Sequence, residues 1–248
     1  MTVFYTKRIM GLRPANSHLG LTRLERNTHG GRCEEDLVLF IIHEKNLFDG
    51  MRHPYSLIEL GSNDGTFTIL SHSTGLYARR SYMIEVDNDR ADVADLFVCR
   101  VRRRVPDHIY VIRQSYTDRW DFLLGNDGPL YLFLNHYHFS IIDDQEELRQ
   151  RIEENCSSGS VLISFDIFFP PRSNWKEERF IITDVPREQT SWRVINRRSI
   201  NSNPAQLMPL TVHKYTKMDA TNYSRYNRSI PPIPISYAAF WRMNACHR

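Results

Sequence analysis

The stretch SLIELGSNDGTF, residues 56–67, decides the fold of this chain. A short apolar run contains one acid, Glu59, and is followed by a turn that holds Gly61, Asn63 and Gly65. Apolar runs of this length are typical of buried strands, and the residues after the turn can begin a helix. Strand, glycine turn and helix together predict the first unit of an α/β domain. A ligand site at the turn and a plain tight turn are both open at this point.

Apolar and amphipathic segments alternate along the rest of the chain. Short runs rich in β-branched and aromatic residues predict strands over 56–60, 81–86, 108–113, 130–135, 160–169 and 210–216. Apolar residues at helical spacing predict helices over 34–48, 87–104 and 143–156. This alternation predicts an α/β fold with a doubly wound, mainly parallel sheet. In such sheets ligands bind beyond the carboxyl ends of the strands.

Composition and charge limit the class of protein. The 248 residues suit one α/β domain with small extensions, and no apolar run approaches the roughly 18 residues of a membrane span. The four cysteines are far apart, so neither a metal site nor a disulfide framework is expected. Residues 34–95 hold twelve acidic and five basic side chains, whereas residues 187–248 hold two acidic and ten basic ones. Basic ends favour an anionic partner such as nucleic acid, and a solvated surface with flexible tails is the equal alternative.

The turn has the residues of a cofactor site that binds no phosphate. Its glycines allow a close backbone approach, and Asn63 tolerates a positive φ. No Lys-Ser/Thr pair follows, and Asp64 at the start of the helix would repel a pyrophosphate. Glu85 lies roughly 25 residues after Glu59, the spacing of an acid that binds a ribose diol. Two acids and an uncharged turn suit a cofactor with a ribose and a cationic centre, such as S-adenosylmethionine.

A second candidate site is LYLFLNHYHFS, residues 130–140, where a predicted strand runs into Asn135. An asparagine at the carboxyl end of a strand faces the same crevice as Glu59 and Glu85. Its carbonyl can accept a hydrogen bond from a cofactor or an amine nucleophile, and the aromatic residues beyond it can line a narrow channel. A turn asparagine followed by core aromatics is the alternative.

Five motifs together resemble a known family. ELGSNDG, IEVD, FLNHYHFS, SGSVLIS and VHKYT occur here in the order and spacing of the disruptor-of-telomeric-silencing (Dot-type, non-SET) histone H3 lysine methyltransferases. The resemblance implies the seven-strand class I S-adenosylmethionine-dependent methyltransferase fold over residues 29–216. It also implies a nuclear enzyme that methylates a lysine in the globular core of histone H3 in nucleosomes. A basic segment, 1–28, precedes this domain, and a basic, Pro-containing tail or arm, 217–248, follows it.

The resemblance assigns a role to each motif residue. Asn135 would orient the methyl donor and acceptor, with Tyr137 and Phe139 lining the acceptor channel. The expected contacts of S-adenosylmethionine are Glu59, Gly61, Ser62, Asn63, Gly65, Glu85, Ser115, Tyr116 and Asn135. Arg32 stands where the family has a cofactor-contacting Glu, and Ser115 stands where it has the Asp that holds adenine. These departures keep two alternatives open, a methyltransferase for another substrate and a catalytically impaired binding module with this fold.

The late part of the chain supplies candidate partner contacts. Trp175 and Trp192 fall in predicted loops on the substrate side, with core packing as the equal alternative. Basic loops and termini could contact DNA phosphate or the acidic surface of a nucleosome, and the basic residues of the late loops are Arg172, Lys176, Arg179, Arg193, Arg197 and Arg198.

Overall fold

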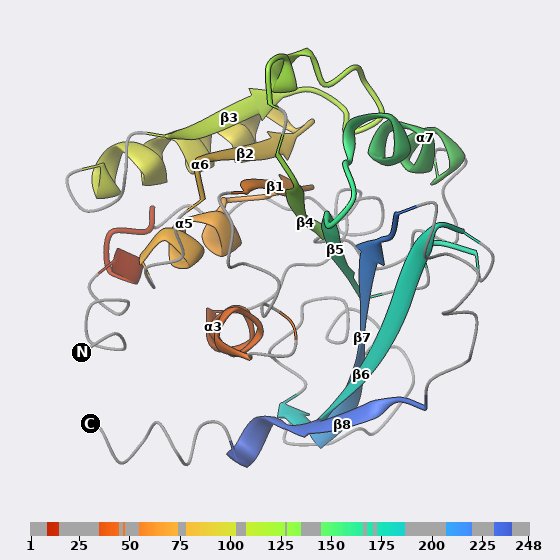
Figure 1. Cartoon of the computed structure of the whole chain (residues 1–248). Coiled ribbons are helices and arrows are strands. Elements are labelled where there is room, and N and C mark those ends of the chain that lie inside the picture. The colour runs from red at the N-terminus through yellow and green to blue at the C-terminus, as the bar shows by residue number, and fades with distance from the viewer. Residues whose placement is uncertain are drawn as a thin grey trace.

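A central β-sheet organises the chain in a computed structural model (Figure 1). The structure describes residues 9–14, 35–44, 47, 55–73, 78–102, 108–126, 128–134, 145–165, 168–170, 173–186, 207–219 and 231–239. Within these ranges an eight-stranded sheet has the order β3-β2-β1-β4-β5-β7-β6-β8. The strands are β1 (Ser56–Leu60), β2 (Arg80–Glu85), β3 (Ile109–Arg113), β4 (Leu130–Leu134), β5 (Val161–Ser164), β6 (Trp175–Pro186), β7 (Leu207–Lys217) and β8 (Ile233–Ser236).

The first five strands form the parallel part of the sheet. The chain moves outward from β1 to β2 and β3, and then returns to the other side of β1 with β4 and β5. The strand order therefore reverses between β1 and β4, where open α/β sheets bind ligands. Leu60, the last residue of β1, lies in register with Leu134 of β4 and Ile84 of β2. The glycine turn thus begins at the carboxyl edge of the sheet, beside this reversal point.

The remaining strands complete the predicted fold. β7 is antiparallel to both β5 and β6, and the order β3-β2-β1-β4-β5-β7-β6 is that of the seven-strand class I methyltransferase fold. The predicted fold class is therefore confirmed. β8, within the segment predicted as a Pro-containing tail or arm, pairs in parallel with β6 at the edge of the sheet. Pro234 fits there because an edge strand can lack one N–H.

One prediction for the late part of the chain is wrong. The region around Trp175 forms β6, a 12-residue strand, and not a loop. The Trp175 indole is buried, stacks on Phe169 with ring centroids 4.5 Å apart, and donates to Glu153 Oε1 at 2.6 Å. Trp175 is therefore a core residue, whereas Trp192 lies outside the described residues.

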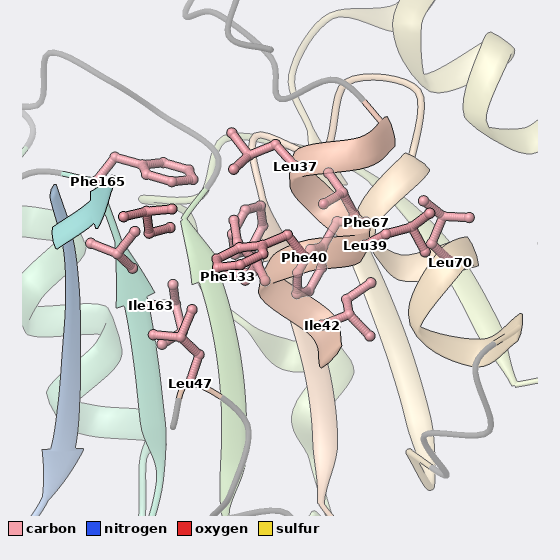
Figure 2. Close-up of a cluster of buried hydrophobic side chains, with 14 of the residues drawn as sticks. Leu37, Leu39, Phe40, Ile42, Leu47, Phe67, Leu70, Phe133, Ile163 and Phe165 are labelled. Carbon is pink, nitrogen blue, oxygen red and sulfur yellow. The ribbon is translucent and has the colours of Figure 1, made fainter. Parts of the chain in front are cut away.

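Helices cover both faces of the sheet. One face carries α3 (Glu35–His43), α5 (Thr66–Ser73) and α6 (Asn88–Val101), and the other carries α7 (Gln145–Asn155) and the short 3₁₀ helix η2 (Asp121–Leu123). Figure 2 shows the apolar side of α3 packed over α5 and the sheet, with Phe40 near the stacked rings of Phe67 and Phe133, whose centroids are 3.8 Å apart. None of the helices that the structure describes has the length and apolarity to cross a membrane.

Candidate functional site at the glycine turn

The turn between β1 and α5 depends on positive φ angles. Gly61, Asn63 and Gly65 have φ values of 67°, 56° and 74°. The prediction that Asn63 adopts a conformation otherwise left to glycine is therefore confirmed. A Cβ built at Gly65 would also overlap the sulfur of Met83 on β2, so a larger residue there would require the Met83 side chain to shift. Glycine at position 65 thus suits both the backbone of the turn and its close packing on the sheet.

In the turn, the backbone N–H groups of Gly61, Ser62, Asn63 and Gly65 donate to protein oxygens. Gly61 N and Ser62 N both donate to Ile84 O at 3.0 Å, which ties the turn to the end of β2. The groups that follow donate to protein oxygens as well: Asn63 N to Glu85 Oε2 (2.8 Å), Gly65 N to Ser62 O (2.8 Å), Thr66 N to Asp64 Oδ1 (3.3 Å) and Thr68 N to Glu59 Oε2 (3.0 Å). A phosphate site at a helix start needs such N–H groups directed at the ligand. The turn is therefore not arranged to hold phosphate.

Glu59 is the most unusual residue of the site. Its side chain is fully buried, and Oε2 accepts hydrogen bonds from Thr68 N at 3.0 Å and Thr68 Oγ1 at 2.7 Å. Oε1 has no hydrogen-bond partner among the described residues, and neither has the buried hydroxyl of Ser62. Burial, with a smaller contribution from the nearby carboxyls of Asp64 and Glu85, raises the pKa of Glu59 to about 8, although the hydrogen bonds from Thr68 lower it. Two buried polar atoms at the turn thus lack the partners that such atoms normally have.

Glu85 lies at the end of β2, as predicted, and forms a hydrogen bond with the backbone of the turn. Its Oε2 accepts from Asn63 N at 2.8 Å, and its Oε1 accepts from Asp87 N at 3.0 Å. Burial raises the pKa of Glu85, whereas these two backbone hydrogen bonds lower it. Each carboxylate oxygen has two lone pairs, so each retains one acceptor position for a ligand hydroxyl.

Asp64 does not have the role that the sequence suggested. Arg13, from a segment 51 residues away, donates from Nε to Asp64 Oδ2 at 2.8 Å and from Nη2 to the same oxygen. Asp64 Oδ1 accepts from Thr66 N at 3.3 Å, at the start of α5, and from Thr66 Oγ1 at 2.6 Å. Because Arg13 neutralises this carboxylate, the expected repulsion of a pyrophosphate by Asp64 is wrong as stated. The engaged N–H groups of the turn, and not Asp64, disfavour a phosphate.

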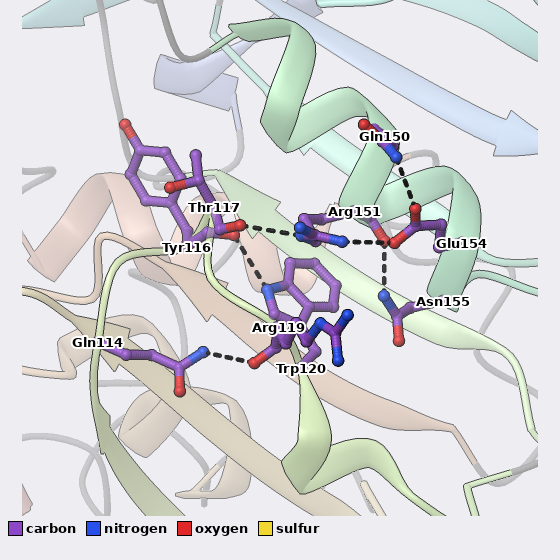
Figure 3. Close-up of polar contacts among 9 residues, drawn as sticks. All are labelled: Gln114, Tyr116, Thr117, Arg119, Trp120, Gln150, Arg151, Glu154 and Asn155. Atoms are coloured by element: carbon purple, nitrogen blue, oxygen red, sulfur yellow. Dashed lines mark hydrogen bonds and ion pairs between the residues drawn. The ribbon is translucent and has the colours of Figure 1, made fainter.

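The predicted adenine contacts lie in the loop that follows β3, shown in Figure 3. Ser115 N donates to Asp118 Oδ2 at 2.9 Å. Tyr116 O accepts from Trp120 Nε1 at 3.0 Å, and Thr117 O accepts from Arg151 Nε of α7 at 2.9 Å. The loop is therefore fixed to α7, and the partly buried Tyr116 ring packs against the core on that face. In Figure 3 this ring points away from Trp120.

Several predicted site residues lie outside the described residues. These are Asn135, Tyr137 and Phe139, then Arg32, which stands where the resembled family has a Glu, and Arg172, Arg193, Arg197 and Arg198 of the late loops. Of the remaining basic candidates, Lys176 pairs with Glu178 at 3.3 Å, and Arg179 is partly buried on β6. The structure thus brings together Glu59, the turn and Glu85, and the roles of the Asn135 motif stay predictions.

Sequence reasoning missed two contributors to the turn. Thr68 supplies both hydrogen bonds to Glu59, and it was detectable, since position 68 falls on the first turns of the predicted helix beside a buried acid. Arg13 gave no signal, because a single arginine in a basic segment has no periodicity that points to a partner 51 residues away.

Comparisons with known proteins give likenesses of fold only. No family model and no curated protein matches the chain. Similar solved structures include the provisionally assigned methyltransferase yhhF of Escherichia coli, with 13% identity over 74% of this chain and 85% of that one and a TM-score of 0.45. Precorrin-6y C5,15-methyltransferase of Geobacter metallireducens has 7% identity over 73% and 87%, with a TM-score of 0.44. An rRNA methylase of Streptococcus thermophilus has 8% identity over 74% and 95%, with a TM-score of 0.43.

Likenesses of this size carry no information about substrate. The strand order itself defines the class of protein, an α/β chain with the class I methyltransferase fold and a glycine turn at the carboxyl edge of its sheet.

Proposed function

We propose that the protein is an S-adenosylmethionine-dependent methyltransferase that binds its cofactor at the turn of residues 61–65. The observation that carries the proposal is the buried Oε1 of Glu59, which has no partner among the described residues and lies beside a turn in which Gly61, Ser62, Asn63 and Gly65 donate their N–H groups to protein oxygens. Such a site suits a ligand that brings a cation or hydrogen-bond donors and no phosphate. S-adenosylmethionine has an ammonium group, a sulfonium, a ribose and no phosphate, and so fits these residues.

Different residues of the site would bind different parts of S-adenosylmethionine. Glu59 Oε1 and the Ser62 hydroxyl, which have no hydrogen-bond partner in the part of the chain that the structure describes, would bind the polar methionine end. The remaining acceptor positions of Glu85 suit the two ribose hydroxyls, and the Tyr116 ring would contact the adenine. The glycines of the turn let the backbone approach closely, and Asn63 maintains the same backbone shape with a side chain.

Catalysis in this proposal depends on alignment. When bound, S-adenosylmethionine supplies a methyl group already activated by the sulfonium, so the protein needs little acid–base chemistry. Asn135 would orient the donor and acceptor, while Tyr137 and Phe139 would exclude water and favour a neutral amine. These three roles are predictions from the motif resemblance.

The acceptor that we propose is a lysine in the globular core of histone H3 in nucleosomes, with the nucleus as the site of action. The support is the resemblance of the five sequence motifs, together with basic termini that suit DNA or an acidic nucleosome surface. Acceptors of another class are the competing outcome of the assay below.

Calorimetric titration tests cofactor binding first. We expect S-adenosylmethionine to bind, and NADH, which carries a pyrophosphate, to bind at least tenfold more weakly. No binding at millimolar S-adenosylmethionine would overturn the proposal. Methyl transfer from labelled cofactor to nucleosomes, free histone H3, RNA and small amines then identifies the acceptor. Asn135→Ala should abolish turnover, and unchanged turnover would remove Asn135 from the site.

A further inference from the structure

The segment of residues 9–14 is docked beside the glycine turn. Ile9 is fully buried and packs with Ile69 of α5 and with Phe97 and Val101 of α6. Leu12 N donates to Ile9 O at 2.9 Å and Arg13 N donates to Met10 O at 3.0 Å, so the segment forms a helical turn of its own. Arg100 of α6 donates from Nη1 to Leu12 O at 3.3 Å. These contacts fix the backbone from which the Arg13 side chain reaches the turn.

Arg13 and Asp64 form a buried ion pair at the turn. Their side chains are only 10% and 4% exposed, and both Nε and Nη2 of Arg13 donate to Asp64 Oδ2. The other oxygen, Oδ1, accepts from Thr66 Oγ1 at 2.6 Å at the start of α5. Removing one member of such a pair leaves an uncompensated buried charge, which is strongly unfavourable. The conformation of the turn therefore depends on a residue from the start of the chain.

The charge that Arg13 neutralises belongs to a crowded group. The carboxyls of Glu59, Asp64 and Glu85 surround one five-residue turn, and those of Asp64 and Glu85 act unfavourably on an ionised Glu59. Glu85 is compensated by the N–H groups of Asn63 and Asp87, whereas Asp64 is compensated by Arg13. Without the arginine, the ionised Asp64 would have to leave the interior to reach water, and this move would break its bond to Thr66.

We infer that Arg13 is a positioning residue of the cofactor site, which holds the turn of residues 61–65 in its binding conformation by neutralising Asp64. The inference rests on the proposed function, because it concerns the affinity of the same site. It makes the segment of residues 9–14 a functional part of the methyltransferase domain, although the sequence placed that segment outside the domain.

A double-mutant cycle separates this role from simple packing. Arg13→Ala should weaken S-adenosylmethionine binding at least tenfold by calorimetry. Asp64→Asn removes the charge but keeps an oxygen that can accept from Thr66, so it should bind within threefold of the wild type. In that background Arg13→Ala should change the affinity less than threefold. Arg13→Lys, which keeps the cation, should retain most of the affinity, and the matched control Glu178→Ala, which removes an ion pair on β6, should bind as the wild type does.

Each result of the cycle decides the inference. An equal loss of affinity in both backgrounds would mean that Arg13 acts by packing alone, and would overturn it. A wild type that binds S-adenosylmethionine while Arg13→Ala binds equally well would overturn the inference and leave the proposed function intact. A wild type that does not bind would overturn both. If Arg13→Ala alone does not fold, the comparison of Asp64→Asn with the double variant decides, and a tenfold weaker double variant would overturn the inference.

Discussion

Replacement of Glu59 by Gln should remove a pH dependence of stability that comes from one buried carboxyl. Burial raises the pKa of Glu59 from 4.5 to about 8 in the folded chain. The protonated form is thus favoured in the folded state. Stability from this group is fully present below pH 4.5 and is lost as the pH rises through about 8. The glutamine is neutral at every pH, and its carbonyl oxygen can accept both hydrogen bonds from Thr68.

The size of the effect follows from the pKa. Between the unfolded and folded values, the folded state holds one more proton than the unfolded state. The free energy of unfolding of the wild type should therefore fall by about 1.4 kcal/mol per pH unit relative to the variant. From pH 5 to pH 8 the relative loss amounts to about 4 kcal/mol. The variant should be about as stable as the wild type at pH 5 and clearly more stable at pH 8.

Urea unfolding of wild type and Glu59→Gln at half-unit steps from pH 5 to pH 8.5 measures this difference. Glu146→Gln is the matched control, because the Glu146 side chain is 84% exposed on α7 and should give a difference that does not vary with pH. A wild-type-minus-Glu59→Gln difference that stays constant over the whole range would refute the reasoning. The same pair tests ligand linkage, since a cationic ligand should bind the wild type more tightly as the pH rises toward 8 and should bind the variant without this trend.

Three further changes test the turn and the loop after β3. Gly65→Ala should lose about 2–4 kcal/mol of unfolding free energy, because position 65 has a positive φ and the new Cβ would overlap Met83 of β2. Gly125→Ala is the control and should lose only about 1–2 kcal/mol, because Gly125 has a φ of 78° but no atom within 4 Å of the new Cβ. Equal losses would contradict the packing role of Gly65. Asn63→Gly should keep the stability within about 0.5 kcal/mol, whereas Asn63→Val should lose about 1–2 kcal/mol, both by urea unfolding. Arg151→Ala removes a hydrogen bond to Thr117 O in the loop that follows β3. In calorimetry it should weaken the binding of adenosine and of S-adenosylmethionine by the same several-fold factor. A loss confined to S-adenosylmethionine would place this loop away from the adenine.

The parallel half of the fold was predictable because its signals are local. β1, β2, β4 and β5 are short, buried and nearly continuous in apolarity, and α6 and α7 have apolar residues at helical spacing, so each of these elements begins within two residues of its predicted start. β6 was missed because its burial does not alternate along most of its length. Its residues 176–179 are all charged and partly exposed. A strand of this kind is fixed by its long pairing with β7, which no local pattern reveals.

The same distinction between local and distant contacts applies to the site. Glu59, the glycines and Glu85 were predictable because strand ends and spacing place them at one edge of the sheet. The role of Asp64 was not, because its charge was judged from its own segment alone. Its partner, Arg13, reaches it only after α5 and α6 have formed the surface on which Ile9 packs.

The compensation of charge at the turn indicates which ligands it can bind. Asp64 is paired with Arg13, and Glu85 accepts two backbone N–H groups, whereas Glu59 has one oxygen without a partner among the residues that the structure describes. An anionic ligand would meet these carboxyls where the N–H groups that could hold it are already engaged. A cationic ligand would instead stabilise the ionised form of Glu59 and supply the missing contact to Oε1. A preference for a cationic, phosphate-free cofactor therefore follows from the buried Glu59 and from the N–H groups of the turn, which already donate to protein oxygens. This preference does not depend on the charge of Asp64, which Arg13 neutralises.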